Sequence, residues 1–468
     1  MKLFINIFFC LLAGLLVYGA PEKYSYEYCL IILIVFIISA VFYFATNRSS
    51  TGNAANFDFF FIFSYGMTNF IYPVFYKPFN SNVSVFELPF NNNVINKSTA
   101  IAYLGFTFFV LGISVYKKIK ICAGLKKEEK PNFEVRPLFL RLIFIVGMVS
   151  FIGYIATGGL AELQKAYSGV DGDLNTVGVF SYFNNIFVIC ANLLAIFVFL
   201  VKDKFTKIIT FGFIAVCSLL MLTTGSRTLV LGLGLILIGS YGRFVGRIPI
   251  FRMIFFLLIG SFFMAFVQMS RGTEFSNDSW ASQAGKNVVI ESPLDIFMDM
   301  IMNNRNLYVL TDFADKFGNV FFLNAVSDIT SPIPGLFSYI LNLTNLPQEV
   351  LSGGALPTFL EFGPRSDWGL GTNLVGEAYV GFSYFGVCII MFLLGYLVKK
   401  TYQNSAKNIY AFVMYSLLLS HAIFFPRAFY LYQPRTVVWS FIIIYSLTLL
   451  TNSLYKTRKK RIPNNSEV

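Results

Sequence analysis

Apolar runs of about 20 residues follow one another along most of this 468-residue chain, and they constrain its fold more than any other feature. An α-helix of that length crosses a hydrocarbon core of about 30 Å, because each residue rises about 1.5 Å. Only 13% of the residues are charged, against roughly a quarter in soluble domains, which excludes an ordinary soluble fold. We predict an all-α polytopic membrane protein with about twelve transmembrane helices, at 3–19, 28–45, 57–76, 98–116, 138–157, 178–201, 208–224, 228–242, 253–270, 372–398, 408–425 and 436–455.

The first run has two interpretations. Lys2 followed by an apolar stretch is typical of a secretory signal peptide, but Tyr18-Gly19-Ala20 makes a poor cleavage site because it lacks the small-x-small pattern. We therefore expect a retained membrane anchor.

Basic residues lie in alternate loops. If both termini are cytoplasmic, that side holds 24 of the 36 Lys and Arg residues but only six of the 24 Asp and Glu residues. This asymmetry is the positive-inside pattern of membrane proteins. The net charge of +12 thus reflects topology, and it does not indicate nucleic-acid binding, which needs basic residues gathered on one solvated face.

One outer loop is much longer than the others. It covers 271–371, between nine predicted helices in 1–270 and three in 372–468, where a basic cytoplasmic tail follows. Loops of this length without a function are uncommon. We interpret this loop as a lid over an active site.

The loop also has a helical pattern near 293–317. Ser292 and Pro293 suit the N-cap and the first helical position, and Gly318 suits the end. Prolines and glycines farther along predict turns and short helices. Apolar residues within the pattern fit a helix lying on the membrane or on the bundle: Phe297, Ile301, Leu307, Leu310, Phe313 and Phe317.

Ionisable residues are almost absent from the predicted spans, unlike in most ion-coupled carriers. Positive charge occurs instead at the outer ends of the spans. Guanidinium groups match phosphate oxygens with planar forks of donors, so these residues suit a lipid pyrophosphate; anchoring to lipid headgroups is the alternative. The candidates at span ends are Arg227, Arg271, Arg427 and Arg435, with Arg305, Lys316 and Arg365 of the large loop as further candidates.

Three other residues are candidates for the chemistry. Glu377, at the start of the tenth span, suits a general base or a ligand of a sugar hydroxyl, and equally a cap of the helix N-terminus. His421 is a possible base or a packing residue in an apolar helix. Tyr379 suits stacking on a sugar ring, although most aromatic residues here belong to the lipid-facing surface.

Metal binding and disulfide bonding are both disfavoured. The chain has one histidine and six cysteines without a C-x-x-C pair, so no zinc-ligand pattern is present. We expect no metal and no cofactor.

Three short motifs give the chain a resemblance to a known family. They are Thr-Gly-Ser-Arg at 224–227, Ser-Arg-Gly at 270–272 and the stretch 376–386, which reads GEAYVGFSYFG. Together with the architecture, they resemble the O-antigen polymerases, the Wzy-type oligosaccharide repeat-unit polymerases.

This resemblance implies a glycosyltransferase of the bacterial inner membrane. Such an enzyme transfers a growing glycan from an undecaprenyl-pyrophosphate carrier to the non-reducing end of a new lipid-linked unit, at the periplasmic face. The resemblance implies no metal and no nucleotide sugar, and it suggests a chain-length regulator and a flippase of the same pathway as partners.

The chain departs from the family pattern in one respect. Family members often carry arginine-rich motifs in two outer loops, whereas the third outer loop here has Lys165 and no arginine. An O-antigen ligase and a lipid-linked oligosaccharide flippase are the alternative functions.

Overall fold

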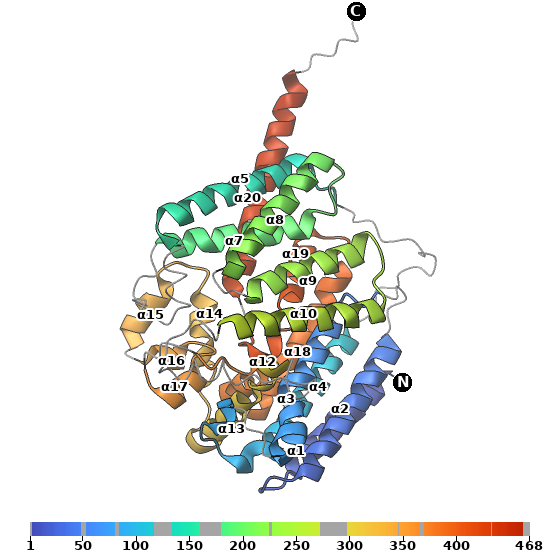
Figure 1. Ribbon diagram of the computed structural model, residues 1–468, viewed down its shortest axis with the longest axis vertical. Helices are drawn as coiled ribbons and strands as arrows, with labels where there is room; N and C mark the ends of the chain where they lie inside the picture. The colour runs from blue at the N-terminus through green and yellow to red at the C-terminus, as the bar shows by residue number, and fades with distance from the viewer. Residues whose placement is uncertain are drawn as a thin grey trace, which may run out of the picture. The chain divides into compact units, whose positions relative to one another are not determined.

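A computed structural model of the chain (Figure 1) describes residues 2–47, 53–79, 84–116, 133–159, 179–223, 227–271, 297–344, 346–364, 369–431 and 433–461. Within these ranges the chain is helical and contains no strand. The all-α prediction is therefore confirmed.

Each of the twelve predicted apolar runs overlaps a helix of the structure. Six helices are long and apolar enough to cross a membrane, and five shorter apolar helices of 10–17 residues accompany them in the described part. This is a polytopic membrane protein, and the number of twelve spans stays a prediction. The six candidates are Tyr26–Thr46, Asn92–Val115, Pro137–Ala156, Lys204–Leu222, Leu374–Asn404 and Pro434–Tyr455.

Reporter fusions can test the topology. Because basic residues favour the cytoplasmic side, we expect fusions after residues 80, 168 and 320 to report an outer location, and fusions after 125, 205, 247, 402 and 460 a cytoplasmic one. One inverted result would remove or add a span.

The chain divides into two compact units. The first unit comprises Met1–Lys126, Arg247–Gln403 and His421–Tyr432, and the second comprises Lys127–Gly246, Asn404–Ser420 and Gln433–Val468. The three segments that we predicted, with boundaries at 270 and 371, stay a prediction.

The second unit has a continuous apolar core, in which α7 packs against α5, α8, α9 and α20. Buried leucine, isoleucine and phenylalanine side chains fill it, as expected for helices that are apolar on every side. Its helices are α5 (Pro137–Ala156), α7 (Val179–Phe197), α8 (Lys204–Thr223), α9 (Arg227–Phe244), α19 (Ile409–Ser420) and α20 (Pro434–Arg461).

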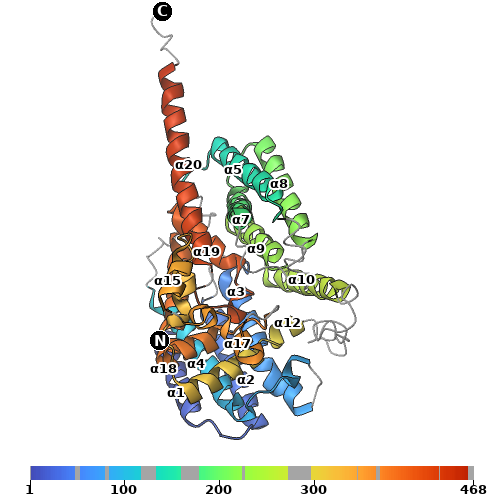
Figure 2. The same cartoon turned by 90° about the vertical axis from the view of Figure 1, so that its left-hand side faces the viewer.

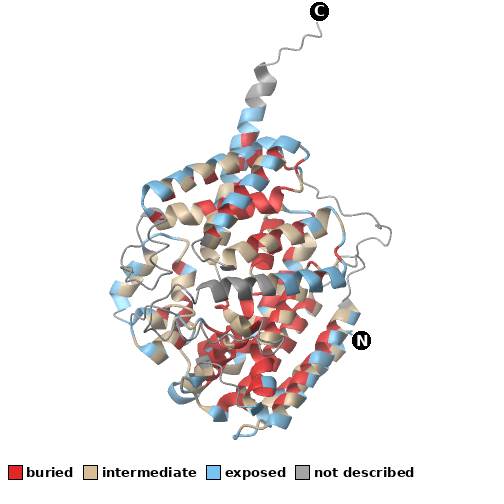
Figure 3. Ribbon diagram, in the orientation of Figure 1, coloured by how far each residue is buried: buried red, intermediate tan, exposed pale blue. Residues whose placement is uncertain are grey.

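In the first unit, α1, α2 and α3 pack around α4, as both views show (Figures 1 and 2), and α4 is mostly buried (Figure 3). Its helices are α1 (Lys2–Tyr18), α2 (Tyr26–Asn47), α3 (Phe57–Ile71), α4 (Ile95–Val115), α10 (Ile250–Arg271), α12 (Met298–Ile301), α13 (Asn304–Phe317), α14 (Val326–Thr330), α15 (Leu336–Thr344), α16 (Gln348–Leu351), α17 (Leu356–Phe362) and α18 (Leu374–Asn404).

Two glycines allow α4 and α18 to touch through their backbones. A Cβ on Gly112 of α4 would lie 2.1 Å from the Phe392 carbonyl oxygen, and a Cβ on Gly395 of α18 would lie 2.1 Å from that of Phe109. Small residues at helix contacts are typical of membrane bundles, because close packing drives association there.

The large loop at 271–371 contains the predicted helix in shortened form. Helix α13 ends at Gly318, which has a φ of 87°, as the sequence predicts. The expected start lies outside the described residues, and a turn at 302–303 separates α12 from α13. Leu307 and Leu310 are buried, whereas Phe317 is exposed, so one face of α13 packs on the bundle.

Helix α18 is broken in its N-terminal part, where we expected one continuous span. Phe382 and Ser383 leave the helical conformation, and Ser383 has a φ of 54°. The loop after α13 supplies donors to the freed carbonyls: Val320 N donates to Val380 O (3.0 Å), and Phe322 N donates to Gly381 O (3.3 Å). Irregular backbone at membrane depth needs such protein partners, because lipid offers none.

Candidate functional site

The carboxylate of Glu377 is fully buried in the first turn of α18 and accepts three hydrogen bonds from neutral groups. Oε1 accepts from Thr372 Oγ1 (2.6 Å) and Gly354 N (3.0 Å), and Oε2 accepts from Asn324 Nδ2 (2.8 Å). Asn324 is held in turn by Tyr430, whose hydroxyl donates to Asn324 Oδ1 (3.2 Å). A sequence neighbour, Thr372, and two more distant residues, Gly354 and Asn324, therefore orient one carboxylate.

The N-cap of α18 is Asn373, not Glu377. Asn373 Oδ1 accepts from the backbone N–H groups of Val375 (3.0 Å) and Gly376 (3.1 Å), and its amide donates to Asn69 Oδ1 (2.9 Å). Glu377 still lies in the first turn, where the helix dipole favours an anion. Because another residue caps the helix, the carboxylate is available for a different role.

Arg427, in the short 3-10 helix Phe425–Arg427, binds α12 of the large loop. Its Nη1 donates to Asp299 Oδ2 (2.5 Å) and to the Asp299 carbonyl oxygen (2.9 Å), and its guanidinium lies 4.7 Å from the centre of the Phe424 ring. The Arg427 side chain is 16% exposed and that of Asp299 is 40% exposed. This partly exposed ion pair is accessible to solutes on the Asp299 side.

Arg305 of α13 is fully buried, yet only part of its guanidinium is bonded. Nη2 donates to the Pro89 carbonyl oxygen (3.0 Å) and to the Glu361 carboxylate, whereas Nε and Nη1 have no hydrogen-bond partner among the described residues. Burial lowers the pKa of Arg305 from its ordinary value, and the bond to Glu361 opposes that shift. An arginine nevertheless stays charged at any working pH, so these unbonded donors carry a free-energy cost that an anion or water would relieve.

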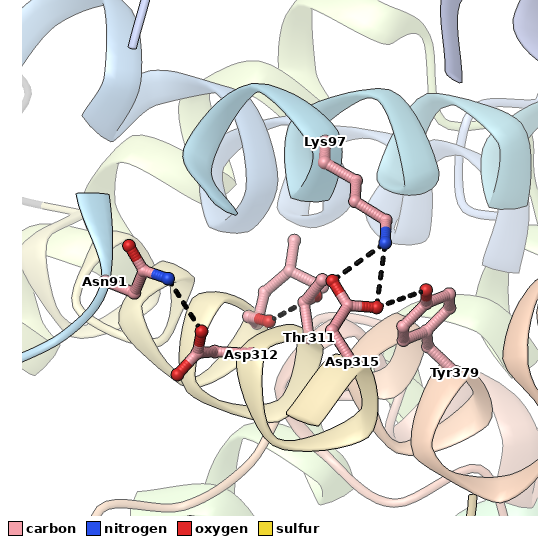
Figure 4. A network of polar contacts seen from close by, with 7 residues as sticks. Asn91, Lys97, Thr311, Asp312, Asp315 and Tyr379 are labelled. Atoms are coloured by element: carbon pink, nitrogen blue, oxygen red, sulfur yellow. Dashed lines mark hydrogen bonds and ion pairs between the residues drawn. The ribbon is translucent and has the colours of Figure 1, made fainter. Parts of the chain in front are cut away.

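A second polar network joins α13 to α4 and α18 (Figure 4). Lys97 Nζ lies 2.7 Å from both carboxylate oxygens of Asp315, and Tyr379 OH donates to Asp315 Oδ1 (2.9 Å). In the same view, Asn91 donates to Asp312 (2.7 Å) on the next turn of α13. Lys97 and Asp315 are about one-third exposed, so this network opens to the surface.

The ring of Tyr379, which we proposed for sugar stacking, is already packed. It is 3% exposed, lies 5.2 Å from the Tyr384 ring, and has Lys97 Nζ 5.6 Å from its centre. A sugar would need this packing to open.

The structure describes four of the other predicted site residues only in part, not at all, or in the other unit. Arg365 lies outside the described residues, and Arg227 and Arg271 are described by their backbone alone, at the start of α9 and the end of α10. Arg435 is half-buried in the first turn of α20 and belongs to the second unit, whereas Arg427 belongs to the first. Convergence of the four arginines stays a prediction.

His421 lies in the turn that follows α19. Its carbonyl oxygen accepts from the N–H groups of Phe424 and Phe425 (2.8 Å each), and the residue is partly buried. This backbone role defines the turn that carries Arg427. A role of the imidazole as a base stays a prediction.

Sequence reasoning missed several residues of these networks. Asn373 had a usable signal, because an asparagine just before an apolar run is a common N-cap. Asn324 and Lys97 had none, because their partners are distant in sequence. Thr372 lies five residues before Glu377 and was not singled out.

A comparison with protein families bears on what this arrangement does. The family model described as O-antigen polysaccharide polymerase Wzy matches residues 2–460, nearly the whole chain. The chain belongs to this family. No curated protein and no solved structure matches it.

Membership in the Wzy family confirms the resemblance noted in the sequence. A Wzy polymerase joins lipid-linked repeat units into a polysaccharide, and this assignment disfavours the ligase and flippase alternatives. The apolar helices agree with a multi-pass membrane location for this Wzy polymerase.

Proposed function

We propose that this Wzy polymerase uses an undecaprenyl-pyrophosphate-linked glycan as donor and acts at the outer, periplasmic face of the bacterial inner membrane. A hydroxyl at the non-reducing end of the lipid-linked acceptor attacks the anomeric carbon of the donor. The bond from that carbon to the pyrophosphate oxygen breaks, and the lipid pyrophosphate leaves. The growing glycan is then one repeat unit longer.

The observation that carries this proposal is the buried, oriented carboxylate of Glu377. We assign it as the general base that accepts the proton of the acceptor hydroxyl. Its three donors are neutral, so no cation of the described residues bonds to the carboxylate and stabilises its negative charge in competition with proton transfer. Because the carboxylate is fully buried, substrate must displace part of the surrounding loop, and Gly354 and Asn324 of that loop contact it directly.

Arg427 is our principal candidate for the pyrophosphate. A phosphate oxygen can replace the Asp299 carboxylate on Nη1, because both are anionic acceptors of charge-assisted hydrogen bonds. Arg305 is a second candidate, since two of its buried nitrogens have no partner within the part of the chain that the structure describes. Four further arginines are included in the proposal on the basis of the sequence alone: Arg227, Arg271, Arg365 and Arg435.

The ladder of surface glycan tests the overall function. Deleting the gene should remove the ladder on a gel and leave a single repeat unit attached, because the unit is still made and exported but is not polymerised. Loss of every unit would indicate a ligase or a flippase instead. A copy of the gene supplied in trans should restore the ladder.

Substitutions at Arg427 test the pyrophosphate contact. A charge-assisted hydrogen bond contributes roughly 1.5–3 kcal/mol, so Arg427→Ala should reduce polymerisation by about ten- to a hundredfold. Arg427→Lys should recover only part of the activity, because lysine keeps the charge but loses the planar fork. The measurement is ladder length at matched protein level in the membrane.

Two further variants separate substrate binding from loop anchoring. Asp299→Asn weakens the ion pair but keeps Arg427, so activity should persist if the arginine serves phosphate. Arg252→Ala, an exposed arginine at the other end of α10 from the large loop, is the matched control and should behave as wild type. Equal losses in Arg427→Ala and Asp299→Asn would mean that the ion pair only anchors α12.

A further inference from the structure

Part of the large outer loop is both uncharged and apolar on its surface. The segment 329–348 contains twenty consecutive residues without Asp, Glu, Lys or Arg. Its helix α15 has no buried residue, and Figure 3 draws it in tan and pale blue. Ile329, Ile333, Tyr339 and Leu343 are each about 60% exposed, which is unusual for large apolar side chains in a water-facing loop.

The backbone of this segment needs little water. Inside α15 the backbone N–H and C=O groups bond to one another. The turn before it is closed by bonds from Ile333 N to Thr330 O (3.0 Å), Leu336 N to Ile333 O (3.3 Å) and Tyr339 N to Gly335 O (3.1 Å). On α15, Tyr339 and Leu343 are four residues apart and share one face. A helix with such a face and a satisfied backbone can lie at a lipid boundary.

An aromatic group connects the same loop with the lipid-facing side of α18. The Phe321 ring lies 5.8 Å from that of Phe382, which lies 6.1 Å from that of Phe385. Phe321 is 69% exposed and Phe385 is 63% exposed. Because α18 is a candidate membrane span, its exposed apolar side chains face hydrocarbon, and the exposed surface of the loop begins beside them.

We propose that residues 329–344 of this segment lie at the membrane surface, where their exposed apolar side chains insert among the acyl chains of the leaflet in which α18 begins. Such elements enter the boundary between headgroups and acyl chains by about 5–10 Å. The occupant is the lipid bilayer, since a water-facing segment would carry charged side chains. Insertion would also hold Asn324, which contacts Glu377, near the lipid boundary. The value of that position for catalysis rests on the proposed function, whereas the insertion itself does not.

The test measures where a probe on α15 lies and needs no catalysis. Leu343→Cys in the full chain is labelled with a small thiol-reactive fluorophore and reconstituted into phospholipid vesicles, with labelled wild type as background for the native cysteines. Lipids with a nitroxide on the acyl chain should remove most of the Leu343→Cys emission, whereas aqueous iodide should remove little. Lys316→Cys, on the exposed side of α13, is the matched control and should show the reverse pattern.

Two outcomes would overturn the proposal. Quenching by iodide at position 343 would place the segment in water, and resistance to both quenchers would place it under another part of the protein. Tyr339→Cys on the same face gives a second reading if Leu343→Cys does not reach the membrane. Loss of the ladder has no bearing on this result, so failure of the insertion and failure of the proposed function are distinguishable.

Discussion

Replacing Glu377 by glutamine is expected to lower polymerisation by about 10²–10⁴-fold, the range associated with loss of a general base. Glutamine has nearly the same size, and its carbonyl oxygen can still accept from Thr372 and Gly354. The Asn324 amide can rotate to present its oxygen to the new NH₂ group. We therefore expect a normal membrane level and no loss of thermal stability, because a buried charge is removed without leaving a cavity. The measurement is ladder length together with an immunoblot.

Two companion variants sharpen this experiment. Glu349→Gln, in the first turn of α16, removes a carboxylate of the same loop outside the Glu377 network and should leave the ladder unchanged. Asn324→Ala removes one donor to Glu377 and should reduce activity less than Glu377→Gln does. Wild-type polymerisation by Glu377→Gln at equal protein level would show that the carboxylate is structural.

Replacing Arg305 by alanine is expected to destabilise the first unit strongly. The guanidinium is fully buried between the Pro89 carbonyl and the Glu361 carboxylate, and breaking a buried pair from one side typically costs about 3–5 kcal/mol. Such a loss is a large share of the stability of a folded domain. We expect a much lower protein level in the membrane and a lower unfolding temperature in detergent.

The neighbouring groups provide the controls for Arg305. Glu361→Gln should have a smaller effect, because the Glu361 side chain is 15% exposed and the Pro89 contact persists. Lys316→Ala on the same helix removes a solvent-exposed pair with Asp312 and should change stability little. If Arg305→Ala folds as well as wild type but fails to polymerise, its unbonded nitrogens serve substrate and not structure.

Helices of the membrane-spanning type could be predicted from the sequence because their signal is local. A run of apolar residues is stable in lipid once its backbone N–H and C=O groups bond to one another within a helix. The position of α5 or α20 therefore follows from its own residues. The end of α13 at Gly318 followed for a similar reason, since glycine adopts positive φ without steric cost. The break in α18 could not be predicted, because its stability depends on donors from Val320 and Phe322, about 60 residues earlier.

The candidate site shows the same division between local and distant causes. Glu377, Arg305 and Arg427 were identified as candidates from residue type and from their positions near span ends or in the large loop. Their partners were not, because Asn324 lies 53 residues from Glu377 and Asp299 lies 128 residues from Arg427. No periodic pattern in the sequence relates residues that are so far apart.

An all-helical membrane protein of the polymerase type could be predicted from the residues alone, because hydropathy and short motifs are properties of neighbouring residues. The folded structure was needed to show that neutral donors surround Glu377 and that Arg305 and Arg427 bind carboxylates of the large loop. The physical reason is that a buried polar group must find hydrogen-bond partners wherever the fold brings them, and the fold brings them from distant segments.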